Sequence, residues 1–361
     1  DELPALIREG YTSFKIYMTY DELKLADRQI IDVLAVDLTD SDGAIGTGFS
    51  YCLSGGAGVV LAAARDLLDN RVQGQAAHTP EALWRHMAAS LNRIGRGAHS
   101  LAMAAIDVAA WDLHALRLDL PLGIAMGGTA RDLPVYGSAD HRPNHSPEES
   151  RDLALAQVAQ GFAGVKPRLS GDGTDGARLS TLRAALPDRV RLMADVNEKC
   201  DPATALHLAA ACADAGCLWL EEPMPAGNTP AFARLAAASP VAIAAGEHLQ
   251  GMSEVMPYLT SGALHVLQPD LAMMGGLTPC LTAARTAESF GLPVAPHFLP
   301  SLFIHLAAAQ PNVTWLEDFP LLEPLLDITA RTENGAMALP TLPGHGMAWA
   351  EGARKRYRLD G

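Results

Sequence analysis

Seven short apolar runs, each ending in a polar residue, follow one another between residues 164 and 317. Segments with helical spacing separate these runs. Apolar runs that alternate with helical segments are typical of parallel strands joined by crossover helices. Because the carboxyl ends of parallel strands in a barrel meet at one rim, we expect the terminal polar residues to share one face of the fold. In chain order these residues are Lys166 with Arg168, Asp195, Glu221, Glu247, Asp270, His297 and Glu317.

Three of these residues predict a metal site. Asp195, Glu221 and Glu247 close three successive runs. Three carboxylates at one rim repel one another unless a cation lies between them, and all-oxygen ligation favours Mg²⁺ or Mn²⁺. For a single run, a strand end that faces solvent is the simpler interpretation. Its recurrence over seven runs favours a shared site.

The periodicity changes along the chain. Residues 32–53 predict two strands around a turn at residues 40–43. Helical spacing dominates from residue 59 to 116, with an amphipathic helix over 102–116. Strand–helix alternation then begins, and the predicted strands are 133–138, 164–169, 191–196, 218–223, 241–247, 265–270, 294–297 and 314–318.

Charge and composition bear on the partners of the protein. The 361 residues carry a net charge of −14, which argues against nucleic acid and anionic membrane surfaces as partners. A small anionic substrate stays compatible, because a metal and local Lys or Arg side chains set the field within a site. The five cysteines include no Cys-x-x-Cys pair. With no signal peptide and no apolar run long enough for a bilayer, we expect reduced thiols and a cytoplasmic location.

The ordered set of motifs resembles the mandelate racemase subgroup of the enolase superfamily over residues 32–361. The motifs are Ala105–Leu113 with Gly127-Gly128, Asp195-Val196-Asn197, Trp219–Pro223, Gly246-Glu247, Gln268-Pro269-Asp270, Pro296-His297 and Leu316-Glu317. The resemblance implies an α/β fold, a modified (β/α)7β barrel with an α+β capping domain. The expected divisions are 1–130 for the cap, 131–328 for the barrel with the active site, and 329–361 for a segment that packs back on the cap. It also implies a homo-oligomer, one Mg²⁺ per subunit (or Mn²⁺) and a small carboxylate substrate.

The same resemblance implies a role for each rim residue. Reactions of this family begin by removing the proton α to a carboxylate. Asp195, Glu221 and Glu247 would hold the metal, and His297 would be the base, oriented by Asp270. Glu317 would donate a hydrogen bond to the substrate carboxylate and should therefore be protonated when it acts. Asn197 would contact the substrate.

Residues 166–168 depart from the family pattern. Racemases of the subgroup carry Lys-x-Lys on the second barrel strand, with the second lysine as a base opposite the histidine. Here the sequence is Lys166-Pro167-Arg168, and arginine, with a pKa above about 12, is a poor proton acceptor. One base suffices for a dehydratase, so acid-sugar dehydration is favoured, with Lys166 and Arg168 binding or polarising the substrate. A racemase or epimerase of a 2-hydroxy acid and a catalytically silent metal-binding homologue remain the alternatives.

Residues 1–36 do not fit the family. They are similar to an internal stretch of a hydantoinase or dihydropyrimidinase, in which Lys15 matches a metal-bridging carboxylated lysine and Tyr20 a substrate-contacting tyrosine. The stretch lacks the His-x-His motif of that family, so it cannot form that site. A gene fusion or a sequence-assignment accident is the favoured explanation. The alternative is an unusual native cap strand, because residues 12–17 have strand propensity.

Overall fold

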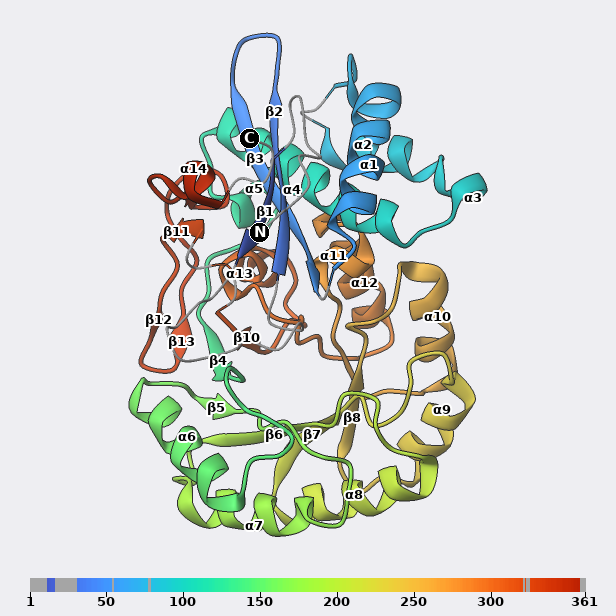
Figure 1. The fold of residues 1–361 in the computed structure, drawn as a ribbon, viewed down its shortest axis with the longest axis vertical. Coiled ribbons are helices and arrows are strands. Elements are labelled where there is room, and N and C mark those ends of the chain that lie inside the picture. Colours follow the sequence, from blue (N-terminus) through green and yellow to red (C-terminus); the bar gives the residue numbers. More distant parts are fainter. Residues whose placement is uncertain are drawn as a thin grey trace, which may run out of the picture.

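The computed structural model describes residues 12–16, 31–53, 55–76, 79–320, 322 and 325–357. The first third of the chain forms a sheet with helices beside it, at the top of Figure 1. Below it, a curved sheet carries helices on its outer side. These two parts correspond to the capping domain and the barrel implied by the sequence motifs.

The cap is built on a three-stranded antiparallel sheet in the order β1-β2-β3. The hairpin predicted over residues 32–53 is confirmed: Asp40 accepts hydrogen bonds from the backbone N–H groups of Asp42 and Ala44 and so fixes its turn. The strands are β1 (Thr12–Ile16), β2 (Ile31–Thr39) and β3 (Ile45–Leu53). The helices are α1 (Ala57–Leu67), the π-helix η2 (Leu68–Val72), α2 (Pro80–Ala88), α3 (Leu91–Ile94), α4 (Ala98–Leu118) and α5 (Leu122–Ala125).

Helix α4 is buried on nearly all sides, which differs from the amphipathic helix predicted over residues 102–116. It lies directly on β3, where two glycines face it. A Cβ at Gly46 would approach the carbonyl oxygen of Ala109 to 2.2 Å, and one at Gly48 would approach that of Ala105 to 2.1 Å. The absent side chains let the helix backbone touch the sheet, while α1 and helices of the barrel cover its other sides.

The second part is a curved sheet of parallel neighbouring strands in sequence order, which confirms the predicted barrel class. Its strands are β4 (Leu133–Gly137), β5 (Gly164–Val165), β6 (Arg191–Asp195), β7 (Cys217–Glu221), β8 (Ala242–Ala245), β9 (Val266–Leu267) and β10 (Leu316–Asp318). β10 pairs with β4 in parallel. Inside the sheet, Tyr136, Met193 and Trp219 form a separate apolar cluster with Val266 and Ala295.

The seventh strand predicted at residues 294–297 is reduced to a single bridging residue. Val294 bridges Leu267 on one side and Val313 on the other. Pro293 and Pro296 flank this position, and proline has no N–H to donate to a ladder. The barrel therefore closes between β9 and β10 through isolated bridges.

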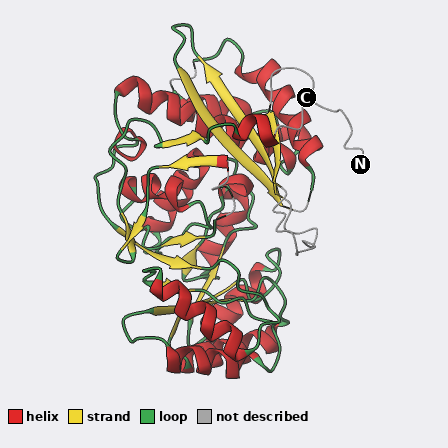
Figure 2. Ribbon diagram, turned by 60° about the vertical axis from the view of Figure 1, so that its left-hand side comes forward, coloured by secondary structure: helices red, strands yellow, loops and turns green. Residues whose placement is uncertain are grey.

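Helices follow the strands and lie outside the curved sheet, as the two views in Figures 1 and 2 show. Side-chain hydrogen bonds cap the starts of several of these helices. Ser146 forms a capping box with Glu149 at the helix that begins at residue 147, and Asp201 and Asn228 cap the helices that begin at residues 202 and 229. The helices are α6 (Pro147–Ala159), α7 (Asp175–Ala185), α8 (Pro202–Asp214), α9 (Thr229–Ala238), α10 (Met252–Ser261), α11 (Leu271–Met274), α12 (Leu277–Ser289) and α13 (Pro300–Ala309).

Buried polar contacts join the cap to the barrel. Asp107 of α4 accepts hydrogen bonds from the backbone N–H (2.8 Å) and hydroxyl (2.7 Å) of Thr278 in α12. Trp84 of α2 donates to the carbonyl of Gly275 at 2.8 Å. Burial raises the pKa of Asp107 to about 7, although the hydrogen bonds from Thr278 oppose that rise.

The C-terminal segment contacts both parts. It contains β11 (Leu326–Ile328), β12 (Thr332–Glu333), β13 (Ala336–Met337), β14 (Met347–Trp349) and α14 (Ala353–Tyr357). β13 pairs with β4 of the barrel. Arg354 forms two hydrogen bonds of 2.6 Å to Asp37 of β2, and the backbone N–H of His345 donates to Asp112 of α4.

Part of the discordant N-terminus lies in the cap. Residues 12–16 form β1, which pairs with β2 in antiparallel register from Thr12↔Ala35 to Ile16↔Ile31. This agrees with the strand propensity noted for that stretch. Residues 1–11 and 17–30, with Tyr20 among them, lie outside the described residues.

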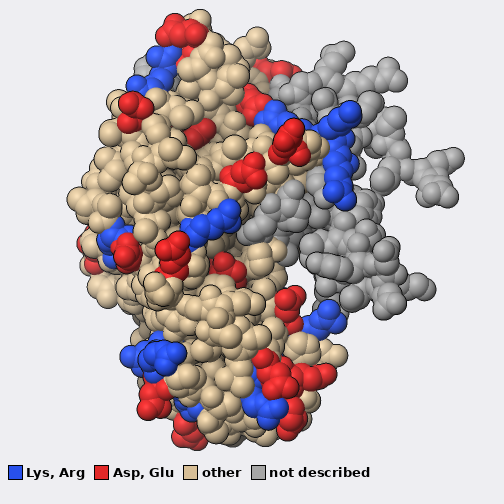
Figure 3. All heavy atoms as spheres, turned by 90° about the vertical axis from the view of Figure 1, so that its left-hand side faces the viewer, with Lys and Arg blue, Asp and Glu red and all other residues tan. Residues whose placement is uncertain are grey.

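Within the described ranges, no helix combines the length and apolar character needed to cross a bilayer. On the face drawn in Figure 3, basic and acidic side chains are interspersed over the coloured surface.

Candidate active site

The predicted base and its partner lie together at the rim. His297 Nδ1 is 2.7 Å from Asp270 Oδ2, and its Nε2 is 3.5 Å from Glu247 Oε2. The hydrogen bond to Asp270 leaves Nε2 as the nitrogen that can exchange a proton with another molecule. Burial lowers the pKa of His297, but the fields of Glu247 and Asp270 outweigh it and raise that pKa to about 10.

Lys166 lies at the centre of the acidic residues and is only 2% exposed. Its Nζ is 2.5 Å from Glu221 Oε1, 2.8 Å from Glu317 Oε1 and 3.9 Å from Asp195 Oδ2. Burial opposes the charge of this ammonium, but the carboxylates of Glu221 and Glu317 hold its pKa well above the usual value. One cation is thus shared among three carboxylates.

The three predicted metal ligands end neighbouring strands. Asp195 and Glu221 are direct partners in the ladder between β6 and β7, and Glu247 follows β8 after one glycine. Burial raises the pKa of Glu221 to about 8, and the nearby charges of Asp195, Glu317 and Glu247 add to this rise while Lys166 opposes it. Burial is therefore the main reason that Glu221 resists ionisation.

The oxygens of these three carboxylates do not converge on one point. In the described part of the chain, the group of three ligand atoms found within 4.8 Å of one another is that of Glu198, Glu222 and His248. His248 Nδ1 pairs with Glu222 at 2.8 Å, and Glu198 accepts a hydrogen bond from the backbone N–H of Ala226. In that group His248 is itself a cation that balances the acids, because the hydrogen bond to Glu222 raises its pKa to about 9.

Arg168 and Asn197 lie beside Asp195. Arg168 Nε is 3.9 Å from Asp195 Oδ2, and its guanidinium carbon lies 5.4 Å from the centre of the Phe319 ring. Asn197 adopts a positive φ of 43° and donates to Asp195 from its backbone N–H (2.8 Å) and side chain (3.0 Å). Asparagine tolerates this conformation better than most residues.

Glu317 is ionised in the structure without substrate, so the expectation that it is protonated when it acts stays a prediction. Its Oε1 faces Lys166 at 2.8 Å, and its Oε2 accepts the backbone N–H of Phe298 at 3.0 Å. Burial favours the neutral acid, but Lys166 and His297 hold the pKa of Glu317 down at about 2. In this arrangement Glu317 is an anionic acceptor, and it becomes a donor only after it takes up a proton.

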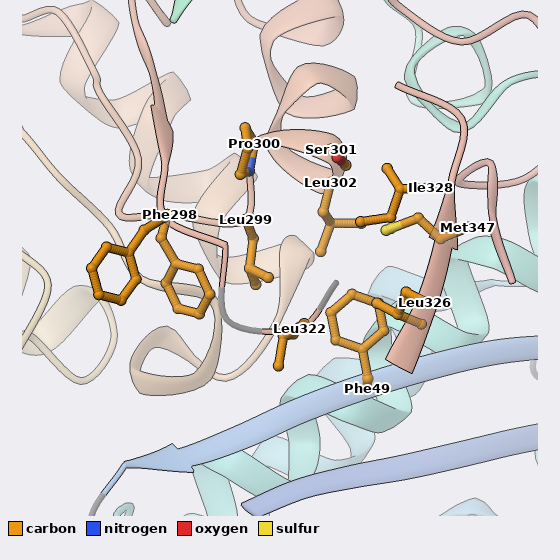
Figure 4. A pocket seen from close by; sticks show the side chains of 11 residues that line it. Phe49, Phe298, Leu299, Pro300, Ser301, Leu302, Leu322, Leu326, Ile328 and Met347 are labelled. Atoms are coloured by element: carbon orange, nitrogen blue, oxygen red, sulfur yellow. The ribbon is translucent and has the colours of Figure 1, made fainter. Parts of the chain in front are cut away.

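An apolar cavity of about 20 Å³ lies next to the predicted base. Figure 4 shows its walls, which come from β3, from the loop after His297, from the start of α13 and from the C-terminal segment. Phe298, adjacent to His297 in the chain, belongs to this wall and packs with its ring centre 5.2 Å from that of the imidazole. Its lining residues are Phe49, Phe298, Leu299, Pro300, Ser301, Leu302, Phe319, Leu322, Leu326, Ile328 and Met347.

Two family matches cover most of the chain. Residues 23–127 match the mandelate racemase / muconate lactonizing enzyme N-terminal domain, and residues 149–353 match the enolase C-terminal domain-like family. The chain belongs to the mandelate racemase family of the enolase superfamily. This confirms the resemblance read from the sequence motifs.

Similar proteins in this family include enzymes that act on sugar acids. L-talarate/galactarate dehydratase of Salmonella typhimurium is 29% identical over 91% of this chain and 83% of its own. The 3,6-anhydro-alpha-L-galactonate cycloisomerase of Streptomyces coelicolor is 32% identical over 88% of each chain. The structure of L-talarate dehydratase from Polaromonas sp. JS666, complexed with Mg and L-glucarate, superposes with a TM-score of 0.89 at 31% identity and covers 96% of this chain and 95% of that one.

Three contacts in the site were not predicted from the sequence. The hydroxyl of Tyr51 donates to Asp270 from the cap. Gln268 and Trp219 donate to the same oxygen of Glu221, at 2.6 Å and 3.1 Å. Gln268 and Trp219 lie within the quoted motifs, two residues from Asp270 and Glu221, so their same-face spacing on a strand was the available signal. No comparable signal marks Tyr51.

Proposed function

We propose that this chain is a Mg²⁺-dependent acid-sugar dehydratase. The observation that carries the proposal is the pairing of His297 with Asp270, together with an arginine at the position of the second family lysine. Lys166, the lysine two positions before Arg168, is engaged by Glu221 and Glu317. A site with one good base suits elimination of water, which needs proton transfer on one face, better than racemisation.

We propose Asp195, Glu221 and Glu247 as the ligands of the metal. Their oxygens suit Mg²⁺, and Asp195 and Glu221 are direct partners across the β6–β7 ladder, with Glu247 after the next strand. Binding at one point requires these carboxylates to turn toward one another. Bound Mg²⁺ would supply Lewis-acid stabilisation of the charge that develops on the substrate carboxylate.

In the proposed reaction, His297 acts in its neutral form: its Nε2 takes the α-proton, and the electron pair of the C–H bond moves toward the substrate carboxylate. The same nitrogen then returns that proton to the β-hydroxyl as the C–O bond breaks and water leaves. The resulting enol becomes a 2-keto acid. Asp270 keeps the ring oriented and supports the imidazolium between these two transfers.

The remaining residues bind and polarise the substrate. Arg168 presents a permanently charged guanidinium group, whose N–H donors suit a carboxylate or hydroxyl group of the substrate. Glu317, held 2.8 Å from Lys166 Nζ, would donate to the substrate carboxylate after it takes up a proton. Asn197 uses its side-chain N–H on Asp195, which leaves its carbonyl oxygen for a substrate hydroxyl.

The test is a screen of mono- and diacid sugars with Mg²⁺ in D₂O, which follows both 2-keto acid formation and deuterium uptake at the α-carbon. The expected result is water loss from at least one acid sugar, abolished by a chelator and restored by Mg²⁺. Exchange and interconversion of α-epimers without water loss would instead establish the racemase alternative. If no acid sugar turns over, the alternative of a catalytically silent metal-binding homologue is favoured.

We also propose the domain divisions at residues 130 and 328, a homo-oligomeric assembly and a cytoplasmic location. The first family match ends at residue 127, and β4 begins at Leu133, which supports the first division. All five cysteines are free and buried, which suits a reducing compartment. Light scattering after gel filtration tests the assembly, and cell fractionation tests the location.

A further inference from the structure

Tyr51 reaches the predicted base pair from the other domain. It lies on β3 in the cap sheet, is 4% exposed, and its hydroxyl donates to Asp270 Oδ2. This is the oxygen that also pairs with His297 Nδ1 at 2.7 Å. The residues that meet there are 219 positions apart in the chain.

Asp270 is held on three sides. Besides Tyr51 and His297, the backbone N–H of Met273 donates to its Oδ1 at 2.9 Å and caps α11. A carboxylate with donors from three separate elements has one orientation. Of the three donors, only the phenol comes from the cap.

The ring of Tyr51 also supports the histidine side of the pair. Its centre lies 4.7 Å from that of Phe298 in an edge-to-face arrangement. Phe298 directly follows His297, and their ring centres are 5.2 Å apart. One cap residue thus touches Asp270 through its hydroxyl and the neighbour of His297 through its ring.

We propose that Tyr51 is a positioning residue for the dehydratase reaction, which aligns the Asp270–His297 pair only when the cap is docked on the barrel. The proposal rests on the proposed function, since it assigns the same pair as the base. It adds that the geometry of the base depends on a residue outside the barrel.

The chemistry of the contact favours orientation over base strength. Burial, with the charge of Asp270, holds the pKa of Tyr51 well above its usual value, so the phenol remains a donor. A donor on Oδ2 competes with the His297 N–H for the same oxygen and does not strengthen its pull on that proton. What the phenol contributes is a fixed carboxylate.

Tyr51→Phe tests this directly, because it removes the donor and keeps the ring against Phe298. We expect kcat to fall about 10- to 100-fold, as for a lost hydrogen bond to a charged group, with KM changed less than about threefold. Tyr258→Phe is the matched control. It removes a phenol from the outer helix α10, where the ring packs on Phe232, and should leave kcat unchanged.

A double-mutant cycle separates this role from a general effect on structure. If Tyr51 acts through Asp270, then Tyr51→Phe should cost nothing further in an Asp270→Asn background. Losses in kcat that multiply in the double variant, or an unchanged kcat in Tyr51→Phe alone, would overturn the proposal.

An NMR measurement distinguishes failure of this proposal from failure of the proposed function. In the full-length, Mg²⁺-supplemented protein with ¹⁵N-histidine, the Nδ1–H resonance of His297 is assigned by its absence in His297→Asn. Tyr51→Phe should shift this resonance or broaden it by faster exchange, and Tyr258→Phe should not. This readout decides the role of Tyr51 even if no acid sugar turns over, and a resonance identical to wild type in Tyr51→Phe refutes it.

Discussion

Replacing Lys166 by methionine should destabilise the protein strongly. The ammonium is 2% exposed and lies 2.5 Å and 2.8 Å from the carboxylates of Glu221 and Glu317. Methionine fills a similar volume but leaves these two buried acids facing each other without a cation. Removing one partner of a buried ion pair costs about 3–5 kcal/mol, so the free energy of unfolding in urea without Mg²⁺ should fall by about that amount.

Two comparisons make the reasoning testable. Lys199→Met is the control, because Lys199 is exposed and its Nζ donates to the carbonyl of Leu169, at 3.1 Å. Its cost should be below about 1 kcal/mol. Added Mg²⁺ should restore part of the loss in Lys166→Met, since it places positive charge among the same acids. A loss below about 1 kcal/mol in Lys166→Met would refute the view that this lysine balances the acidic centre.

Three other predictions concern the reaction and its pH dependence. His297→Asn should lower turnover at least about 10²-fold while Mg²⁺ binding, measured by calorimetry, persists; near-normal turnover would remove His297 from the mechanism. Wild type should exchange the α-proton from one face only, and Arg168→Lys should gain slow exchange from the other face in D₂O; useful epimer interconversion by wild type would contradict this. The pKa of His297 is about 10 in the folded protein, whereas its ordinary value is 6.5. The ion pairs of His297 therefore stabilise the fold fully below about pH 6.5, and this stabilisation is lost as the pH rises toward 10. The difference in free energy of unfolding between metal-free wild type and His297→Asn, measured in urea, should disappear as the pH rises through this range. Mg²⁺ at Glu247 should shift the pH range of this loss to lower values.

The strand ends could be predicted from the sequence because each combines an apolar run with one polar residue, a pattern set by burial alone. The predicted seventh strand is longer than the observed one. Its residues are apolar enough for a strand, but the prolines at 293 and 296 limit its pairing. The local sequence pattern indicates which residues are buried, but it does not indicate which backbone N–H groups find an acceptor.

The arrangement within the site was less accessible to sequence analysis. Lys166 could be placed at the rim, but its position between Glu221 and Glu317 depends on how long side chains turn toward one another. The ionised state of Glu317 follows from that position. Tyr51 sits in a strand of mostly buried residues and resembles any core tyrosine, because its partner Asp270 lies far away in sequence and in another domain.

The wall of the barrel that carries His297 has no regular ladder, but single backbone hydrogen bonds hold it on both sides. The N–H groups of Ala295 and His297 donate to the carbonyls of Leu267 and Pro269, at 3.0 Å and 3.1 Å. On the other side, the N–H of Val294 donates to the carbonyl of Asn312 at 2.8 Å. The backbone of the base is therefore tied to the residue directly before Asp270, so a shift of this part of the chain moves both members of the pair together.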